Sequence, residues 1–116
     1  MDSKQKVFNL IGLATKAGKT KSGEFSTEQS VKKGRACLVV VAEDASDNTK
    51  KMFQDMCGYY HVKISIFGSK AELGRAMGKE MRASLSVEDA GLASAIGKQM
   101  AAAGQQRMTI NGGSEV

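Results

Sequence analysis

The apolar run over residues 36–42 is the sequence feature that most constrains the fold. It reads ACLVVVA and contains no charged residue. A near-continuous apolar run of this kind indicates a strand that is buried on both faces of its sheet. Such a strand requires helices above and below the sheet. It is also far shorter than a segment that crosses a bilayer, and no other apolar run approaches that length.

The segments around this strand alternate between helical and strand patterns. Val7, Ile11 and Ala14 recur at helical spacing in the first segment, and Ser69 with Glu72 forms a capping box that begins a later helix. We therefore predict an α/β chain of four strands and five helices, with helices on both faces of a small sheet. The predicted helices cover residues 4–17, 24–33, 43–60, 69–77 and 88–103, and the predicted strands cover residues 19–22, 36–42, 62–67 and 82–87.

The length of 116 residues fits one domain with its own core. We predict a single domain over residues 1–103 and a flexible tail over residues 104–116, where the sequence turns polar and glycine-rich. Because the N-terminus lacks a signal-peptide pattern, we expect a cytoplasmic protein. Cys37 and Cys57 lie in apolar patterns and are interpreted as buried small side chains.

The positive charge is concentrated in the first third of the chain. Residues 1–35 hold eight Lys or Arg against three Asp or Glu, which accounts for the whole net charge of +5. One interpretation is a solvated face with excess lysine, and the other is a local patch that binds a polyanion.

Residues 18–34 give the second interpretation a structural basis. A glycine, a short Lys/Thr/Ser run that fits a strand, and a second glycine precede a helix-compatible segment. The first turn of that helix would present unpaired N–H groups and the positive end of its dipole beside Lys19 and Lys21. This combination favours phosphate.

No catalytic constellation emerges from the sequence. Gly18-Lys19-Thr20 ends like a phosphate-binding loop, but Gly12 lies one residue too far away and a helix precedes it where a strand is required. The single histidine, His61, lacks a nucleophile motif and reads as a C-terminal helix residue. The carboxylate pairs at residues 43–44 and 88–89 are explained as helix starts. We predict no enzyme activity, no metal and no cofactor.

Two sequence blocks resemble a known family. Residues 38–45 (LVVVAEDA) and residues 69–80 (SKAELGRAMGKE) are similar to the two signature blocks of the kink-turn-binding ribosomal proteins of the L-seven-Ae type, which has small bacterial members. The similarity covers roughly residues 5–100. It implies a three-layer α/β/α sandwich around a four-stranded mixed sheet of order 1-4-2-3, with strand 4 antiparallel to the others.

The resemblance also implies where RNA binds. In the family a glycine and the helix start after it receive tandem G·A pairs, and a second loop holds an extruded base. Gly23 matches the glycine, and residues 79–81 match the loop, with Met81 as its apolar wall. If strand 4 runs beside strand 1, Arg82 and residues 23–26 form one surface.

This chain departs from the family at the helix start. Phe25, Ser26 and Gln29 stand where kink-turn binders have Asn, Glu and, three residues later, Lys. Phe25 either packs under the neighbouring helix or stacks on an unpaired base at the RNA face. Relatives that bind proteins instead of RNA share this fold, so the alternative function is a protein-interaction module that has lost kink-turn specificity.

The sequence as a whole predicts a monomeric, non-catalytic protein that recognises structured RNA of ribosomal type, with ribosomal or other proteins as further partners. The phosphates would be neutralised by lysines near the N-terminus. The predicted RNA-binding residues are Lys19, Lys21, Gly23, Glu24, Phe25, Ser26, Gln29, Lys32, Lys79, Glu80, Met81 and Arg82.

Overall fold

A computed structural model describes residues 2–104 of the chain. Within this range five helices and four strands follow one another in the predicted order. The helices are α1 (Ser3–Lys16), α2 (Glu24–Lys32), α3 (Asp47–Tyr60), α4 (Lys70–Ala76) and α5 (Ala90–Ala102). The strands are β1 (Thr20–Ser22), β2 (Leu38–Val41), β3 (Lys63–Ile66) and β4 (Ser84–Val87).

The four strands form one mixed sheet of order β1-β4-β2-β3. β2 pairs with β3 in parallel, and β4 runs antiparallel to both β1 and β2. Both the order and the direction of β4 are as the family resemblance implied. All four residues of β2 are buried, which confirms that the apolar run forms the centre of the sheet.

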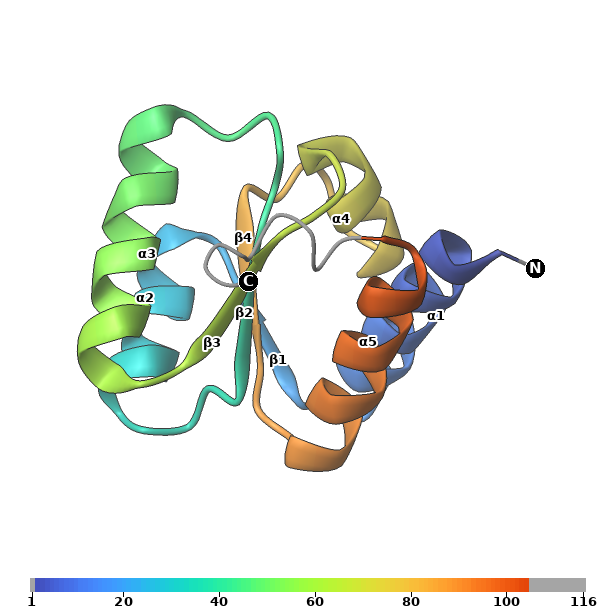
Figure 1. Cartoon of the computed structure of the whole chain (residues 1–116), viewed down its shortest axis with the longest axis horizontal. Helices are drawn as coiled ribbons and strands as arrows, with labels where there is room; N and C mark the ends of the chain where they lie inside the picture. Colours follow the sequence, from blue (N-terminus) through green and yellow to red (C-terminus); the bar gives the residue numbers. More distant parts are fainter. Residues whose placement is uncertain (1, 105–116) are drawn as a thin grey trace.

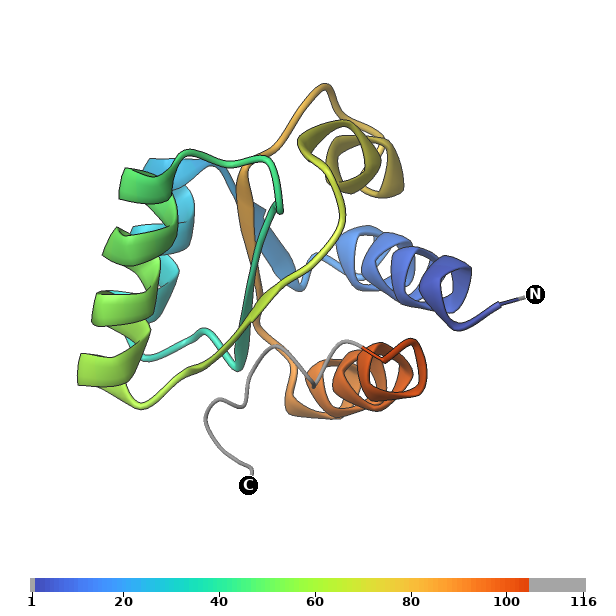
Figure 2. The same ribbon diagram turned by 45° about the horizontal axis from the view of Figure 1, so that its top comes forward.

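Helices cover both faces of the sheet, as predicted. α2 and α3 lie on one face, and α1, α4 and α5 lie on the other (Figures 1 and 2). The core combines side chains from both layers with the central strands; its largest fully buried members include Phe53, Ile11, Leu73, Leu85 and Ile96. No helix within residues 2–104 has the length and apolar content needed to cross a membrane.

The register of the strands divides the connecting loops between two ends of the sheet. Ser22 pairs with Leu85 near one end, which we call the Gly23 end, and α2 begins there. Thr20 pairs with Val87 at the other, which we call the Lys19 end. α4 and the loop after it lead into the start of β4 at the Gly23 end, and α2 and α3 both finish at the Lys19 end (Figure 1).

Several predicted boundaries were too generous. β2 covers only residues 38–41 of the apolar run. β4 begins at Ser84 because residues 82–83 form a loop, in which the Arg82 N–H donates to the carbonyl of Lys70 at 3.0 Å. α3 begins at Asp47 and not at residue 43, since Ser46 is its N-cap. Asp44 instead accepts a hydrogen bond from the Lys70 N–H at 2.8 Å, so the first carboxylate pair does not cap a helix.

The local signals at other helix ends are confirmed. Ser69 and Glu72 form the full capping box of α4. Asp89 caps α5 through the Leu92 N–H at 2.8 Å. His61 ends α3 in the left-handed conformation, with φ of 60°.

The two cysteines were interpreted as buried side chains. Cys57 is buried, as predicted, whereas Cys37 is only partly buried. Residues 105–116, most of the predicted tail, lie outside the described residues.

Candidate nucleic-acid interface

α2 starts without a capping side chain. Gly23 occupies the N-cap position with φ of 89° and ψ of 160°, a backbone conformation that essentially only glycine adopts. The first intrahelical bond runs from the Thr27 N–H to the Gly23 carbonyl at 3.0 Å. The N–H groups of residues 24–26 have no hydrogen-bond partner in the described part of the chain. They are therefore available to an anionic or carbonyl-bearing ligand.

The loop before β4 lies against this helix start, as predicted. The Arg82 Nε donates to Ser22 Oγ at 3.0 Å, and one of its Nη groups donates to the Met81 carbonyl at 3.0 Å. Just beyond the β1–β4 pairing, the Gly23 N–H donates to the Ser84 carbonyl at 3.0 Å. These bonds fix the loop at residues 79–82 and the start of α2 as one surface.

A glycine in α4 positions the same loop. The Lys79 N–H donates to the Gly74 carbonyl at 2.8 Å, and a Cβ added at Gly74 would overlap the carbonyl of Glu80. The loop thus folds directly onto the helix and leaves a shallow hollow of about 540 Å³, lined by Ala71, Arg75, Gly78, Lys79, Glu80 and Met81. Gly74, Arg75 and Ser22 were not among the predicted site residues.

Two apolar side chains stand in solvent at this surface. Phe25 is 73% exposed and Met81 is 58% exposed. The alternative in which Phe25 packs under a neighbouring helix is therefore wrong. We name the group formed by Gly23, Glu24, Phe25, Met81 and Arg82 the Gly23 surface.

Hydroxyl groups hold α2 onto the sheet. Ser84 Oγ donates to Thr27 Oγ1 at 3.4 Å, and Ser86 Oγ donates to Ser30 Oγ at 2.8 Å. Ser30 Oγ in turn donates to Glu88 Oε2 at 2.7 Å. These hydrogen bonds explain why α2 needs so few apolar residues. It buries three side chains, those of Thr27, Ser30 and Val31, and only Val31 is apolar. Ser26 and Gln29 are half-buried on the same helix.

The predicted lysines do not all reach the Gly23 surface. Lys21 is exposed in the middle of β1, an edge strand. Lys19 lies at the opposite end of that strand, where its carbonyl accepts from the Glu88 N–H at 2.7 Å. Lys32 ends α2, eight residues (about 12 Å) from Glu24, the first residue of the helix. The expected single surface is therefore divided between the two ends of the sheet, because β1 carries Lys19 away from Gly23.

Lys32 is also engaged within its own helix. Its ammonium group lies 2.6 Å from Glu28 Oε2, and this hydrogen bond raises the pKa of Lys32 above its usual value. The lysine stays charged, but its neighbour cancels part of that charge for a ligand.

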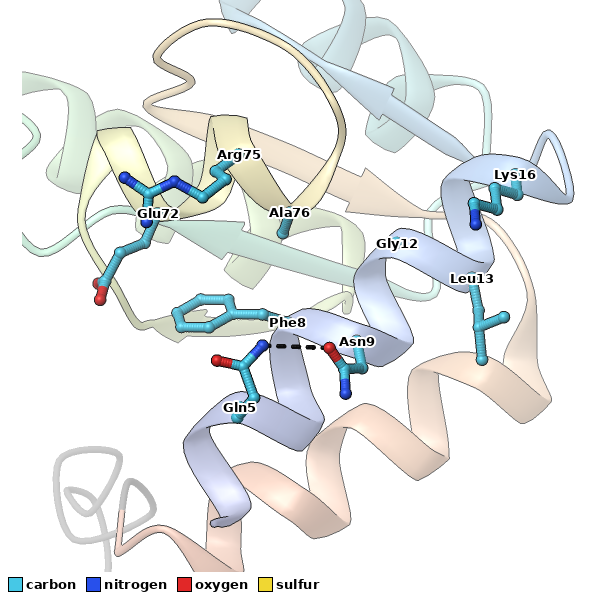
Figure 3. Close-up of a pocket in the computed structure, with 9 residues that line it drawn as sticks. All are labelled: Gln5, Phe8, Asn9, Gly12, Leu13, Lys16, Glu72, Arg75 and Ala76. Atoms are coloured by element: carbon cyan, nitrogen blue, oxygen red, sulfur yellow. Dashed lines mark hydrogen bonds between the residues drawn. The ribbon is translucent and has the colours of Figure 1, made fainter. Parts of the chain in front are cut away.

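A second hollow lies between α1 and α4, on the face of the sheet opposite α2 (Figure 3). Its volume is about 520 Å³, and Gln5 Nε2 donates to Asn9 Oδ1 at 3.1 Å on one wall. Gly12 lets α1 approach α4, since an added Cβ would lie 3.0 Å from the Ala76 carbonyl. Residues 2–104 contain no cluster of three or more side chains that would hold a metal ion.

The fold and this site together define a class: an α/β/α sandwich that exposes an uncapped helix start, a fixed guanidinium and two apolar side chains on one surface. Residues 5–108 match the model of the ribosomal protein L7Ae/L30e/S12e/Gadd45 family, and the chain belongs to that family.

Similar proteins include RNA-binding and ribosomal proteins. The RNA-binding protein YlxQ of Bacillus subtilis is 45% identical over 86 residues, which cover 74% of this chain and 86% of that protein. The large ribosomal subunit protein eL8 of Thermoplasma volcanium is 30% identical over 106 residues, covering 90% of this chain and 88% of that protein.

Solved structures share the same fold. A protein of unknown function from Bacillus halodurans superposes with a TM-score of 0.80 at 34% identity, over 83% of this chain and 97% of that one. The 15.5kD RNA binding protein of Giardia lamblia superposes with a TM-score of 0.72 at 26% identity, over 85% of this chain and 88% of that one.

Proposed function

We propose that this protein is a non-catalytic RNA-binding protein that recognises a sharply bent, structured RNA of ribosomal type through the Gly23 surface. The observation that carries the proposal is the uncapped start of α2, whose free N–H groups lie beside the loop that Arg82 ties to Ser22. Relatives named for RNA binding or for the ribosome support it.

Each part of the Gly23 surface has a role in this proposal. The N–H groups of residues 24–26 and the dipole of α2 receive base edges or a phosphate oxygen. Arg82 keeps donors beyond the two that bind Ser22 Oγ and the Met81 carbonyl, and directs them at the backbone of the RNA. Lys21 and Lys79 neutralise neighbouring phosphates.

The exposed apolar side chains serve unpaired bases. A bent RNA turns bases out of its stack, and such bases bind to aromatic or apolar side chains. Phe25 provides an open ring face, and Met81 borders the hollow beside α4. Ser26 and Gln29 offer fewer base-edge contacts than a carboxylate and a lysine, so Phe25 supplies by stacking what those positions lack.

Recognition of the RNA bend is tested with a matched pair of RNAs. One contains a kink-turn with tandem G·A pairs, and the other replaces those two pairs with Watson–Crick pairs so that the duplex stays straight. We expect the kinked RNA to bind at least tenfold more tightly in a filter assay. Equal affinities would contradict recognition of the bend, and no binding to either would favour the protein-interaction alternative.

The exposed phenylalanine gives a second test. Phe25→Ala removes the open ring and is expected to weaken binding of the kinked RNA by about 1–3 kcal/mol. Because the side chain is exposed, the melting temperature should stay unchanged; Leu13→Ala, a change at an exposed leucine on α1, is the control. An equal loss of RNA affinity in Leu13→Ala would contradict a specific role for Phe25.

The protein acts, in this proposal, as a cytoplasmic monomer whose RNA-binding domain covers residues 1–103. Crosslinking in cells followed by sequencing of the attached RNA identifies the target. Recovery of ribosomal RNA is expected.

A further inference from the structure

A second group of exposed side chains lies at the Lys19 end of the sheet, where α2 and α3 finish. We name it the Tyr59 surface. Its members are Lys32, Lys33, Arg35, Tyr59, Tyr60, His61 and Lys63, all of them exposed. None of the aromatic members belongs to the site described above.

The topology brings these residues together from three segments. α2 and α3 lie side by side on one face of the sheet, and both run towards this end (Figures 1 and 2). Glu28 raises the pKa of Lys32 most, and Tyr60 at the end of α3 adds a smaller contribution in the same direction, which is consistent with the packing of α2 against α3. His61 and Lys63 also line a hollow with Ala36, which follows Arg35 in the loop that leads into β2, and α5 forms the other wall of this hollow.

The two tyrosines form an aromatic pair that the core does not use. Tyr59 is 78% exposed and Tyr60 is 40% exposed. Their ring centroids lie 4.9 Å apart with an interplanar angle of 78°, an edge-to-face arrangement. An edge-to-face pair leaves a ring face of the more exposed tyrosine open to a stacking partner.

The cations of the Tyr59 surface are largely unpaired. The side chains of Lys33, Arg35 and Lys63 make no hydrogen bond or ion pair with any residue between 2 and 104. Glu28 is paired with Lys32, and Asp55 of α3 is paired with Lys51 at 3.1 Å. Cations at the end of α2 also stabilise the helix dipole. That stabilisation does not explain Lys63 on β3 or two exposed aromatic rings.

Open aromatic rings among unpaired cations match single-stranded RNA. Such proteins follow the phosphate backbone with cations and stack bases on aromatic faces, with little dependence on sequence. The outer side of α2 connects this surface to the first one, because Phe25, Gln29 and Lys32 are spaced by four and three residues and so share one face of the helix. From Phe25 to Lys32 the distance along the helix axis is about 10 Å.

We propose that the Tyr59 surface binds an unpaired RNA segment that flanks the bent element held at the Gly23 surface. The inference rests on the proposed RNA-binding function and extends it from one contact surface to two. A base stacks on Tyr59 while Lys33, Arg35 and Lys63 neutralise the adjoining phosphates.

Two RNAs separate the contributions of the two surfaces. The first is the kink-turn element alone, and the second carries an unpaired uridine extension of about six nucleotides, placed on each end in turn. Fluorescence anisotropy should show that one extension improves the affinity of the unmodified protein about tenfold. Tyr59→Ala and the double change Lys33→Gln with Arg35→Gln should each remove most of that gain. Both should leave the affinity for the element alone unchanged.

Matched variants control for stability and for charge. Tyr59→Phe keeps the ring and should keep the gain. Lys6→Gln removes one exposed lysine from α1, in the layer opposite α2 and α3, and should also leave the gain intact. Melting temperatures of all variants should stay within a few degrees of the unmodified protein, because the changed side chains are exposed and the helix-dipole and ring-pair contributions they remove are small.

The outcomes divide clearly. If neither extension improves binding, or if the gain survives Tyr59→Ala, the proposal is overturned. If the kink-turn element itself does not bind, the proposed function has failed. In that case ultraviolet crosslinking to a uridine 12-mer alone, read by mass spectrometry, decides the second surface. A crosslink at Tyr59 or Tyr60 supports it, and the absence of one there overturns it.

Discussion

At Gly74 the loop that carries Met81 lies so close to α4 that no side chain fits between them. Gly74→Ala places a Cβ on the backbone carbonyl of Glu80, and backbone cannot rotate away as a flexible side chain does. We expect the free energy of unfolding to fall by about 1–3 kcal/mol. RNA affinity should fall as well, because the loop must move.

The matched control is another helical glycine with open surroundings. Gly58 lies in α3, and an added Cβ there meets nothing within 4 Å. Gly58→Ala should therefore raise stability by up to about 1 kcal/mol through helix propensity. Denaturant unfolding measures both variants. A Gly74→Ala protein as stable as the unmodified chain would show that the loop is not fixed on α4.

Burial decides the chemistry of the two cysteines. Desolvation raises the pKa of the Cys57 thiol to about 11, so it carries almost no thiolate at neutral pH. We expect a thiol reagent at pH 8 to modify the partly buried Cys37 and to leave Cys57 unmodified until the protein unfolds. Mass spectrometry of the digested product reads each site. Rapid modification of Cys57 in the folded protein would contradict its place in the core.

The element that sequence patterns described least well is α2. Its boundaries and its low apolar content were predicted, but the Ser30–Ser86 and Ser30–Glu88 hydrogen bonds were not. A serine in a sequence gives no sign of which strand it will face, since that depends on pairing between distant segments. By contrast, the capping box of α4 lies within four consecutive residues, and the sequence identified it directly.

The hydroxyl contacts between α2 and β4 predict a measurable coupling. Ser30→Ala leaves the buried Ser86 hydroxyl and the Glu88 carboxylate each without a partner, so the free energy of unfolding should fall by about 1–3 kcal/mol. Adding Ser86→Ala to this variant removes one orphaned group and should cost less than Ser86→Ala costs alone. A double-mutant cycle in denaturant measures the difference. Additive effects would mean that the two serines act independently.

The start of α4 gives a pH-dependent contribution to stability. The hydrogen bond from the Ser69 N–H is the largest influence that lowers the pKa of Glu72, with the nearby Lys4 acting in the same direction and burial opposing them. A carboxyl whose pKa is lower in the folded state stabilises the fold above its unfolded pKa of about 4.3. That stabilisation is lost as the pH falls through the folded pKa. Glu72→Gln should therefore narrow the difference in stability between pH 7 and pH 3.

At the scale of the whole molecule, the sandwich was predictable and the position of the lysines was not. The apolar run over residues 36–42 fixed a central strand with helices on both faces, and the family resemblance supplied the strand order. The direction of β1 decides which end of the sheet each neighbour reaches. Lys19 and Gly23 are four residues apart in sequence, yet that short strand separates them because it pairs along its length with β4.

This separation predicts how salt affects RNA binding. Lys21, Lys79 and Arg82 lie on or beside the Gly23 surface, so the kink-turn element alone should release counterions from about three phosphates. The slope of log affinity against log salt should then be roughly −2 to −3. Lys21→Gln should reduce its magnitude by about 0.9, whereas Lys19→Gln, at the far end of β1, should leave it unchanged with this RNA. Titration of binding at several salt concentrations gives each slope. An affinity of the unmodified protein that does not change with salt would favour a protein partner. An equal effect of Lys21→Gln and Lys19→Gln on the slope would show that both lysines contact the RNA as parts of one surface.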